Sequence, residues 1–306
     1  MKFAQISLFA SMIATFVHGF SFSEISSELT ADEESRIFGG SIADIDSHKY
    51  VASLHNYGVT SDKFCAGMLI SPEFLITAGH CLNTPMFNVW AIIGSNHRMG
   101  GGSRNSEMIK VVEAFRHPMY NSSNDFVTIP YDVALLKLET PSKIKPVRLA
   151  AADGSDSKAG SMATTLGWGL IKNETESQLL RTVDIKILTT AECVRLYAMA
   201  SGVSPLAFGN VPILDNSTIC AGSGNGKDSC EGDSGGPLLV NDVLVGIVSS
   251  GYEECGISPG SYASVSEALD FITEIIGGGS TGNVTDKLTA STNIFELLGI
   301  PDGSNQ

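Results

Sequence analysis

Short apolar runs alternate with clusters of Gly, Pro, Asn and Ser over most of the chain. Between Ile37 and about Ala263 these runs are rich in β-branched residues and read KYVASLH, GMLISPEFLITA, FNVWAIIGS, MIKVVEAF, DVALLKLE, TVDIKIL and DVLVGIVSS. Short strands bounded by turn residues are typical of β-sandwiches and β-barrels. The pattern therefore predicts an all-β fold for this part of the chain.

The period of the pattern changes near the C-terminus. SVSEALDFITEII, which ends at Ile276, has apolar residues at helical spacing, and three glycines follow at 277–279. Glycine directly after such a pattern is a common helix stop. We therefore expect a short C-terminal helix that closes the domain at Ile276. The segment 277–306 is rich in Gly, Ser, Thr and Asn, which predicts a flexible tail.

The N-terminal segment has the layout of a secretory signal peptide. Lys2 precedes an apolar stretch over 3–17, and small or polar residues follow from His18. Such a stretch is too short to form a stable membrane span. We expect a signal peptide over 1–19, an acidic pro-segment over 20–36 and export of a soluble, extracellular protein.

Composition and charge narrow the class of protein. The 306 residues are 43% hydrophobic and 17% charged, as in a packed globular chain. Asp and Glu number 33 against 19 Lys and Arg, which gives a net charge of -14. An acidic chain of this kind lacks a basic surface for phosphate groups, which argues against nucleic acid as a partner.

The cysteines form an even set in a chain that we expect to be exported: Cys65, Cys81, Cys193, Cys220, Cys230 and Cys255. Disulfides are favoured in that compartment, but sequence alone leaves their pairing open. Zinc is the rival interpretation, yet the sequence has no CxxC pair and no HExxH motif. Four Asn-x-Ser/Thr triplets fit export if the host glycosylates them, namely those at Asn121, Asn173, Asn216 and Asn283.

Three short segments carry the residue types that nucleophilic catalysis needs. CEGDSGGP places Ser234 among glycines, which let backbone amides come close to the serine oxygen. TAGHC provides His80, and YDVALLKL provides Asp132 at the start of an apolar strand. A serine hydroxyl needs a neighbouring base, and the base needs an orienting acceptor. Each segment alone has an ordinary structural explanation, but the three together form a specific set.

With these residues the sequence resembles the trypsin-like serine proteases of the chymotrypsin family over 37–276. The resemblance implies two antiparallel β-barrels that divide near residue 150, with a site in the cleft between them. It also implies the roles of the three residues. Ser234 would attack the substrate carbonyl, His80 would act as general base and then as acid, and Asp132 would orient His80.

The same resemblance implies further residues around the nucleophile. The backbone N–H groups of Gly232 and Ser234 would hold the oxyanion, and Ser249, at the edge of the substrate site, would donate a hydrogen bond to Asp132. No cofactor and no metal are implied.

A specificity pocket also follows from the resemblance. Asp228 matches the carboxylate at the pocket floor, where it would select a cation. Gly251 and Gly260 match wall positions that must lack side chains for a long residue to enter, and Ser229 would add a hydroxyl beside the carboxylate. The resemblance therefore implies cleavage after Arg or Lys.

RIFGG resembles the activation site of the family. Cleavage between Arg36 and Ile37 would free an α-ammonium group that pairs with Asp233 beside the nucleophile. Before cleavage, we expect Asp233 to have no cation partner. Family spacing also implies the disulfides Cys65–Cys81, Cys193–Cys220 and Cys230–Cys255.

Several positions depart from the family pattern. Gly79 stands where alanine is usual, which predicts a mild change. Ser250 replaces a tryptophan, so the subsites beyond the specificity pocket lose an apolar platform. HRMGGGSRNS occupies the place of an acidic calcium loop, and we therefore expect no calcium.

Two functions fit this set of residues. The first is a secreted, monomeric serine endopeptidase that is made as a zymogen. Its expected partners are protein or peptide substrates with Arg or Lys and proteinaceous inhibitors. Neither nucleic acid nor a membrane is an expected partner. The alternative is a catalytically weak or silent homologue that acts as a binding or inhibitor protein, for example of glucanases. A purely structural secreted β protein fits less well, because the triad and the pocket aspartate are all present.

Overall fold

The structure is a computed structural model, and it describes residues 39–83, 86–123, 128–171, 175–202, 215–251 and 254–288. The predicted signal peptide and pro-segment lie outside the described residues, as does the chain after Leu288. Within the described part, no helix combines the length and hydropathy that a bilayer span requires.

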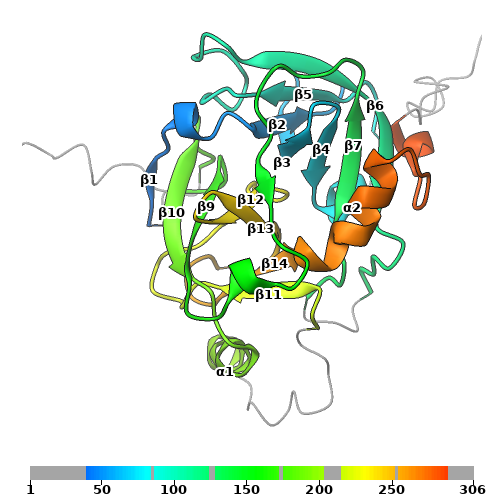
Figure 1. The fold of residues 1–306 in the computed structure, drawn as a ribbon. Coiled ribbons are helices and arrows are strands. Elements are labelled where there is room, and N and C mark those ends of the chain that lie inside the picture. The colour runs from blue at the N-terminus through cyan, green and yellow to red at the C-terminus, as the bar shows by residue number, and fades with distance from the viewer. Residues whose placement is uncertain are drawn as a thin grey trace, which may run out of the picture. The chain divides into compact units, whose positions relative to one another are not determined.

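Six antiparallel strands form a closed barrel in the N-terminal half of the chain (Figure 1). Their order is β2-β3-β4-β7-β6-β5, and pairing between β5 and β2 closes the ring. The polar side chains of the fully buried strand β2 are satisfied internally, because Ser53 Oγ and Ser61 O hydrogen-bond the two ring nitrogens of His55. The strands are β2 (Val51–His55), β3 (Lys63–Ser71), β4 (Phe74–Thr77), β5 (Trp90–Ile93), β6 (Glu107–Arg116) and β7 (Ala134–Leu138).

A second sheet of eight strands follows the order β1-β10-β9-β12-β13-β14-β11. It closes on itself beyond the end of β10, where Ile187 bridges Ala221 of β11. The eighth strand, β8, pairs in parallel with β13. The prediction of an all-β fold with two sheets is confirmed. The strands are β1 (Ser41–Ile42), β8 (Arg148–Leu149), β9 (Met162–Gly167), β10 (Arg181–Lys186), β11 (Thr218–Ala221), β12 (Pro237–Val240), β13 (Val243–Ser250) and β14 (Gly260–Ser264).

The segment before and after β8 joins the two sheets. Val147 N donates to Leu69 O of β3, and three residues later Ala150 N donates to Leu244 O of β13. A single cluster of buried apolar side chains includes residues of both sheets. The two halves therefore share one continuous core, as expected when closely packed apolar faces exclude water.

The short C-terminal helix predicted from the apolar spacing is present as α2 (Leu269–Ile276). It lies beside β7 in Figure 1 and buries Phe271, Ile272 and Ile275, with the Phe271 ring edge-on to that of His117. A second helix, α1 (Thr190–Ser201), was not predicted, because its buried side chains are few. The short 3-10 turns are η1 (Ile45–Ser47), η2 (Gly79–Leu82), η3 (Ser155–Ser157), η5 (Ser266–Ala268) and η6 (Thr285–Leu288).

Residues 280–288, which the sequence analysis assigned to a flexible tail, pack on the first barrel. Val284 N donates to Ala114 O of β6, and the hydroxyl of Thr285 accepts from Ala114 N. Leu288 is buried. The segment is therefore attached mainly by backbone hydrogen bonds and by the buried side chain of Leu288. Because backbone hydrogen bonds leave no pattern in the sequence, this attachment was not predicted. The rest of the predicted tail lies outside the described residues.

Candidate active site

A hydrogen-bonded histidine–aspartate pair lies between the two sheets. His80 belongs to η2, which follows β4, and Asp132 lies just before β7. Asp132 is fully buried, and its carboxylate accepts from His80 N (2.7 Å), from His80 Nδ1 (2.7 Å) and from the hydroxyl of Ser249 (2.6 Å). Because a carboxylate only accepts, Nδ1 carries the proton of the neutral ring and Nε2 keeps its lone pair. The pair therefore presents His80 as a base.

The glycine that precedes His80 has a local structural reason. A Cβ atom at Gly79 would lie 2.8 Å from the ring of Tyr120 and 3.2 Å from Asp132 Oδ1. The Tyr120 hydroxyl is in turn held by Asn83 Oδ1 at 2.9 Å. An alanine at position 79 would push this ring away, so Gly79 and Tyr120 form a matched pair beside the histidine.

Ser234 lies in a loop that is fixed to both sheets. Ser234 O accepts from Ala66 N of β3 (2.8 Å), and Gly235 N donates to Val248 O of β13 (2.9 Å). Gly235 has φ +79°, and a Cβ there would lie 2.3 Å from Ala66 O. The loop thus requires glycine after the serine, as expected for such a close backbone approach.

The amides on either side of Asp233 are available to a ligand. Within the described residues, the N–H groups of Gly232 and Ser234 donate to no atom, although every carbonyl from Cys230 to Ser234 accepts a hydrogen bond. Taken from the carbonyl of Cys230 to that of Ser234 in sequence order, the donors are Asp233 N, Leu170 N, Lys63 Nζ, Gly236 N and Ala66 N. A loop with satisfied carbonyls and open amides can hold a negative oxygen.

A pocket of about 500 Å³ opens next to Ser234. Its wall includes Ser249, which hydrogen-bonds Asp132, so the pocket joins the serine to the histidine–aspartate pair. Ser250 and Gly251 continue this wall. Among the described residues, no atom lies within 4 Å of a Cβ placed at Gly251, so this position has room on the pocket wall.

Asp228 is buried behind Ser229, which lines this pocket. Asp228 Oδ2 accepts from Gly256 N at 3.1 Å, whereas Oδ1 has no hydrogen-bond partner among the described residues. Burial raises the pKa of Asp228 to about 7, against the lowering effect of the hydrogen bond from Gly256. A Cβ at Gly260 would lie 3.1 Å from the free Oδ1. The carboxylate thus has one oxygen open to a cationic or hydrogen-bonding partner.

Sequence reasoning missed one residue that supports the pocket wall from behind Ser229 through a hydrogen bond, Tyr262, which is fully buried. Its hydroxyl shares a hydrogen bond of 3.0 Å with Ser229 Oγ. Burial raises the pKa of Tyr262, so the phenol stays neutral and can hold the serine next to Asp228. The available sequence signal for Tyr262 was the alternation along its strand. Side chains along a strand point alternately to its two faces, and β14 directs the large side chain of its Gly-Ser-Tyr segment inwards.

Asp233 is buried in a site built from glycines. Its two carboxylate oxygens accept from Gly169 N (2.7 Å) and Cys230 N (2.9 Å), and a Cβ at Gly167 or Gly169 would collide with it. Burial raises its pKa, and the charge of Lys63 opposes that shift. The predicted partner Ile37 and the predicted cleavage residue Arg36 lie outside the described residues.

Lys63 is the second residue that sequence reasoning missed. Its ammonium is buried and acts electrostatically on the Asp233 carboxylate, but the two groups form no ion pair among the described residues. The expectation that Asp233 has no paired cation before cleavage therefore stays a prediction. Lys63 Nζ also donates to Gly232 O at 2.5 Å. The only sequence signal was a charged residue at the start of the apolar run KFCAGMLIS.

The three disulfides that the resemblance implied are present, namely Cys65–Cys81, Cys193–Cys220 and Cys230–Cys255. Cys65 and Cys81 lie close to His80 in a group that resembles a metal site. Their sulfur atoms are bonded to each other, so they offer no thiolate to a metal ion. Instead, this disulfide ties η2 to β3.

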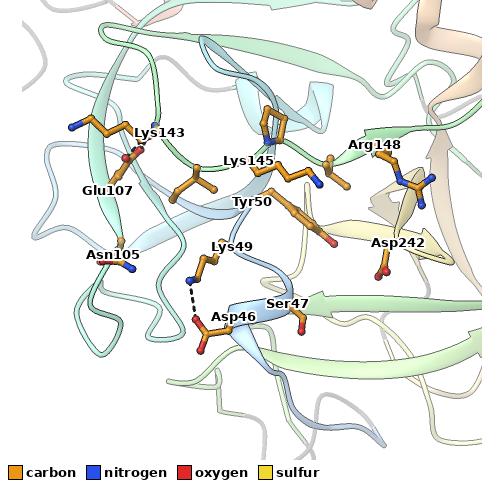
Figure 2. Close-up of a pocket in the computed structure, with 14 residues that line it drawn as sticks. Asp46, Ser47, Lys49, Tyr50, Asn105, Glu107, Lys143, Lys145, Arg148 and Asp242 are labelled. Atoms are coloured by element: carbon orange, nitrogen blue, oxygen red, sulfur yellow. Dashed lines mark hydrogen bonds and ion pairs between the residues drawn. The ribbon is translucent and has the colours of Figure 1, made fainter.

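A larger pocket of about 760 Å³ lies among η1, the residues just before β2, the start of β6 and the residues before β8 (Figure 2). Cations and carboxylates are mixed in its wall, where Lys49 pairs with Asp46 at 2.9 Å. Tyr50 is buried there, and its burial raises its pKa. This pocket contains none of the predicted catalytic residues, so size alone does not identify the site.

A buried aspartate that holds a histidine and Ser249, together with a glycine-bounded serine on the pocket that Ser249 lines, is typical of the chymotrypsin-like serine proteases. Residues 37–272 match the family model described as Trypsin, and the chain belongs to this family.

Relatives of two kinds are similar to the chain. It is 36% identical over 261 residues to glucanase inhibitor protein 3 of Phytophthora infestans, an alignment that covers 81% of this chain and 92% of the relative. It is 37% identical over 250 residues to trypsin 5G1 of Aedes aegypti, with 79% and 85% covered. Among solved structures, neuropsin, a serine protease expressed in the limbic system of mouse brain, matches with a TM-score of 0.64 and 27% identity, over 78% of this chain and 98% of that one.

Proposed function

We propose that the chain is the precursor of a secreted serine endopeptidase that cleaves after Arg or Lys. The observation that carries the proposal is the buried Asp132 carboxylate, which holds His80 through two hydrogen bonds and Ser249 through a third. A buried carboxylate with these partners is suited to stabilising an imidazolium.

In the proposed reaction, His80 Nε2 takes the proton of Ser234 Oγ as that oxygen attacks the substrate carbonyl carbon. The carbonyl electron pair moves onto its oxygen, and the open amides of Gly232 and Ser234 stabilise the negative charge. The carbon–nitrogen bond then breaks, and the leaving amine takes the proton from His80. Water repeats the sequence on the acyl-enzyme and releases the acid product.

Specificity for a basic residue follows from Asp228. A long cationic side chain can pass Gly251, where a Cβ would meet open space, and reach the unpartnered carboxylate oxygen. Ionised Asp228 would compensate the charge of the buried cation, whereas a pocket without it would leave that charge unpaired.

Activation is proposed to require cleavage between Arg36 and Ile37. The new α-ammonium would pair with Asp233, whose carboxylate already accepts two backbone N–H groups. Because Arg36 suits the proposed pocket, the mature protein can also cut its own precursor.

Export is proposed from the signal-like segment over 1–19 and from three disulfides. The side chains of Asn121, Asn216 and Asn283 are exposed, as glycosylation requires, whereas Asn173 lies outside the described residues. A single chain carries all of the proposed catalytic residues, so we propose a monomer.

A second candidate function is inhibition of a glucanase. It is favoured by the relatives whose names describe glucanase inhibitors, at 36% and 35% identity. On this interpretation the catalytic residues would be retained without turnover, and a surface of the fold would bind the glucanase.

One experiment separates the two functions. The protein cleaved after Arg36 is assayed on an arginyl amide substrate and in a glucanase inhibition assay, with Ser234→Ala as the test variant and Ser223→Ala, an exposed serine of the same region, as the control. We expect turnover in the wild type and the control, and a loss of several powers of ten in Ser234→Ala. No turnover in the wild type, together with glucanase inhibition that Ser234→Ala retains, would replace the first proposal by the second.

A further inference from the structure

We propose that Lys63 is a positioning residue that holds the carbonyl side of Gly232 and so helps to keep the Gly232 amide, which belongs to the preceding peptide plane, facing the substrate carbonyl. The inference depends on the proposed protease function, because it assigns a role within the same site. It concerns a residue that lies outside the triad and outside the specificity pocket.

The placement of Lys63 is unusual for a lysine. It begins β3, is only 6% exposed, and shows no ion pair among the described residues. Lysine is rarely buried without a partner, because an ammonium group loses its hydration. Here Nζ donates to the carbonyl of Gly232 at 2.5 Å, across 169 positions of sequence. The ammonium therefore binds a backbone oxygen of the loop that carries the nucleophile.

Gly232 joins two peptide planes, one with its own amide and one with its own carbonyl. The direction of the amide depends on how both planes are held. The plane before it is held through Glu231 O, which accepts from Leu170 N at 2.8 Å. In a trans peptide the N–H points away from the C=O, so this contact directs the Gly232 amide to the opposite side. The plane after Gly232 is held on both sides, by Lys63 at its carbonyl and by the hydrogen bond from Asp233 N to Cys230 O. With both planes held, the glycine cannot rotate its amide out of place.

Glycine needs this restraint more than any other residue. Gly232 has φ +90°, a region that glycine enters freely and leaves freely. The positive φ disfavours a side chain at this position, and a Cβ would also lie 3.1 Å from the backbone Cα of Gly169. The conformation must therefore be fixed by contacts from outside, and Lys63 supplies one of them.

The charges around Lys63 keep its ammonium in place. Asp233 attracts it, whereas Arg98 repels it, and the buried His55 is a further titratable neighbour. Arg98 is itself paired with Glu176 and with Asp62, the latter at 3.0 Å. Burial lowers the pKa of Lys63 to about 8, so the group is mostly protonated at neutral pH.

The test compares Lys63→Met, which keeps the length and removes the charge, with Lys63→Arg, which keeps the charge. Lys158→Met, at an exposed lysine, is the control for the loss of one positive charge. Three quantities are measured on the cleaved protein, namely kcat and KM for an arginyl amide, the inhibition constant of benzamidine, and hydrogen exchange of the amides over 231–236.

We expect Lys63→Met to lower kcat by about ten- to a hundred-fold, somewhat less than the loss of an entire oxyanion donor. KM and the benzamidine constant should change by less than about twofold, because the specificity pocket does not involve Lys63. Exchange over 231–236 should become faster. Lys63→Arg should recover most of the loss in kcat, and Lys158→Met should equal the wild type.

Two results would overturn the proposal. One is a kcat in Lys63→Met within twofold of the wild type, and the other is a parallel loss of benzamidine binding, which would indicate general damage to the fold. If the wild type itself proves inert, the protease function fails, and hydrogen exchange alone then decides the role of Lys63. Unchanged exchange over 231–236 in Lys63→Met would refute a positioning role even in an inert protein.

Discussion

The proposed pocket carboxylate, Asp228, should make the binding of a cationic ligand depend on pH. Asp228 is 5% exposed, and burial raises its pKa to about 7, so below that pH the empty pocket holds a neutral acid. Benzamidine is a permanent cation over this range and needs the ionised form. Its affinity should therefore rise with pH up to about 7 and then become constant.

The size of the effect follows from the fraction of ionised Asp228. With a pKa of about 7, roughly nine tenths of the carboxyl group is ionised at pH 8 and roughly one hundredth at pH 5. The apparent dissociation constant should therefore increase about a hundred-fold between these pH values. Asp228→Asn should bind weakly at every pH, because the neutral amide cannot compensate the buried cation.

The assay is a calorimetric or fluorescence titration of benzamidine at half-unit steps from pH 5 to pH 8. Asp270→Asn, which changes an exposed carboxylate on α2, is the matched control and should reproduce the wild-type profile. A dissociation constant that changes by less than about threefold over this range would refute the reasoning. So would an unchanged affinity in Asp228→Asn.

Three further predictions concern the catalytic pair, the pocket entrance and activation. Ser249→Ala removes the 2.6 Å hydrogen bond to Asp132 and should lower kcat about tenfold at nearly constant KM. The measurement is steady-state kinetics on an arginyl amide, and an unchanged kcat would contradict this prediction. Gly251→Val fills open space at the pocket wall, so the protein should have the melting temperature of the wild type. It should bind benzamidine at least about tenfold more weakly, and equal binding would show that Gly251 does not line the pocket entrance. The Arg36→Gln precursor, verified as uncut by mass spectrometry, should show less than about one hundredth of the activity of the cleaved protein, and full activity would rule out a zymogen.

Local patterns explain why much of the fold was predictable. A strand is recognised by the alternation of apolar and polar residues that are close in sequence. The backbone geometry around His80, Asp132 and Ser234 is likewise determined within the short segment that contains each residue. Within the described part, the structure brings Asp132 to His80 and places Ser234 on the pocket that Ser249 lines. These features have signals that are contained within a few residues.

Other features depend on contacts between distant segments. Lys63 meets Gly232 across 169 positions, and neither residue has a periodic or motif signal for that contact. The helix α1 buries only Cys193, Tyr197 and Ala198, so its apolar stripe is narrow, although Thr189 and Gly202 cap its ends. Residues 280–288 dock mainly by backbone hydrogen bonds, which leave no mark on the pattern of side chains.

Fluorophosphonate labelling shows directly whether Ser234 is the nucleophile, because the reagent reacts with a serine that is activated by a neighbouring base. The protein cleaved after Arg36 is treated with the probe, and the modified residue is identified by peptide mass spectrometry. We expect rapid, stoichiometric labelling at Ser234, with none in Ser234→Ala and little in the uncut precursor. A cleaved, folded protein that stays unlabelled, or that is labelled at another residue, would contradict this expectation.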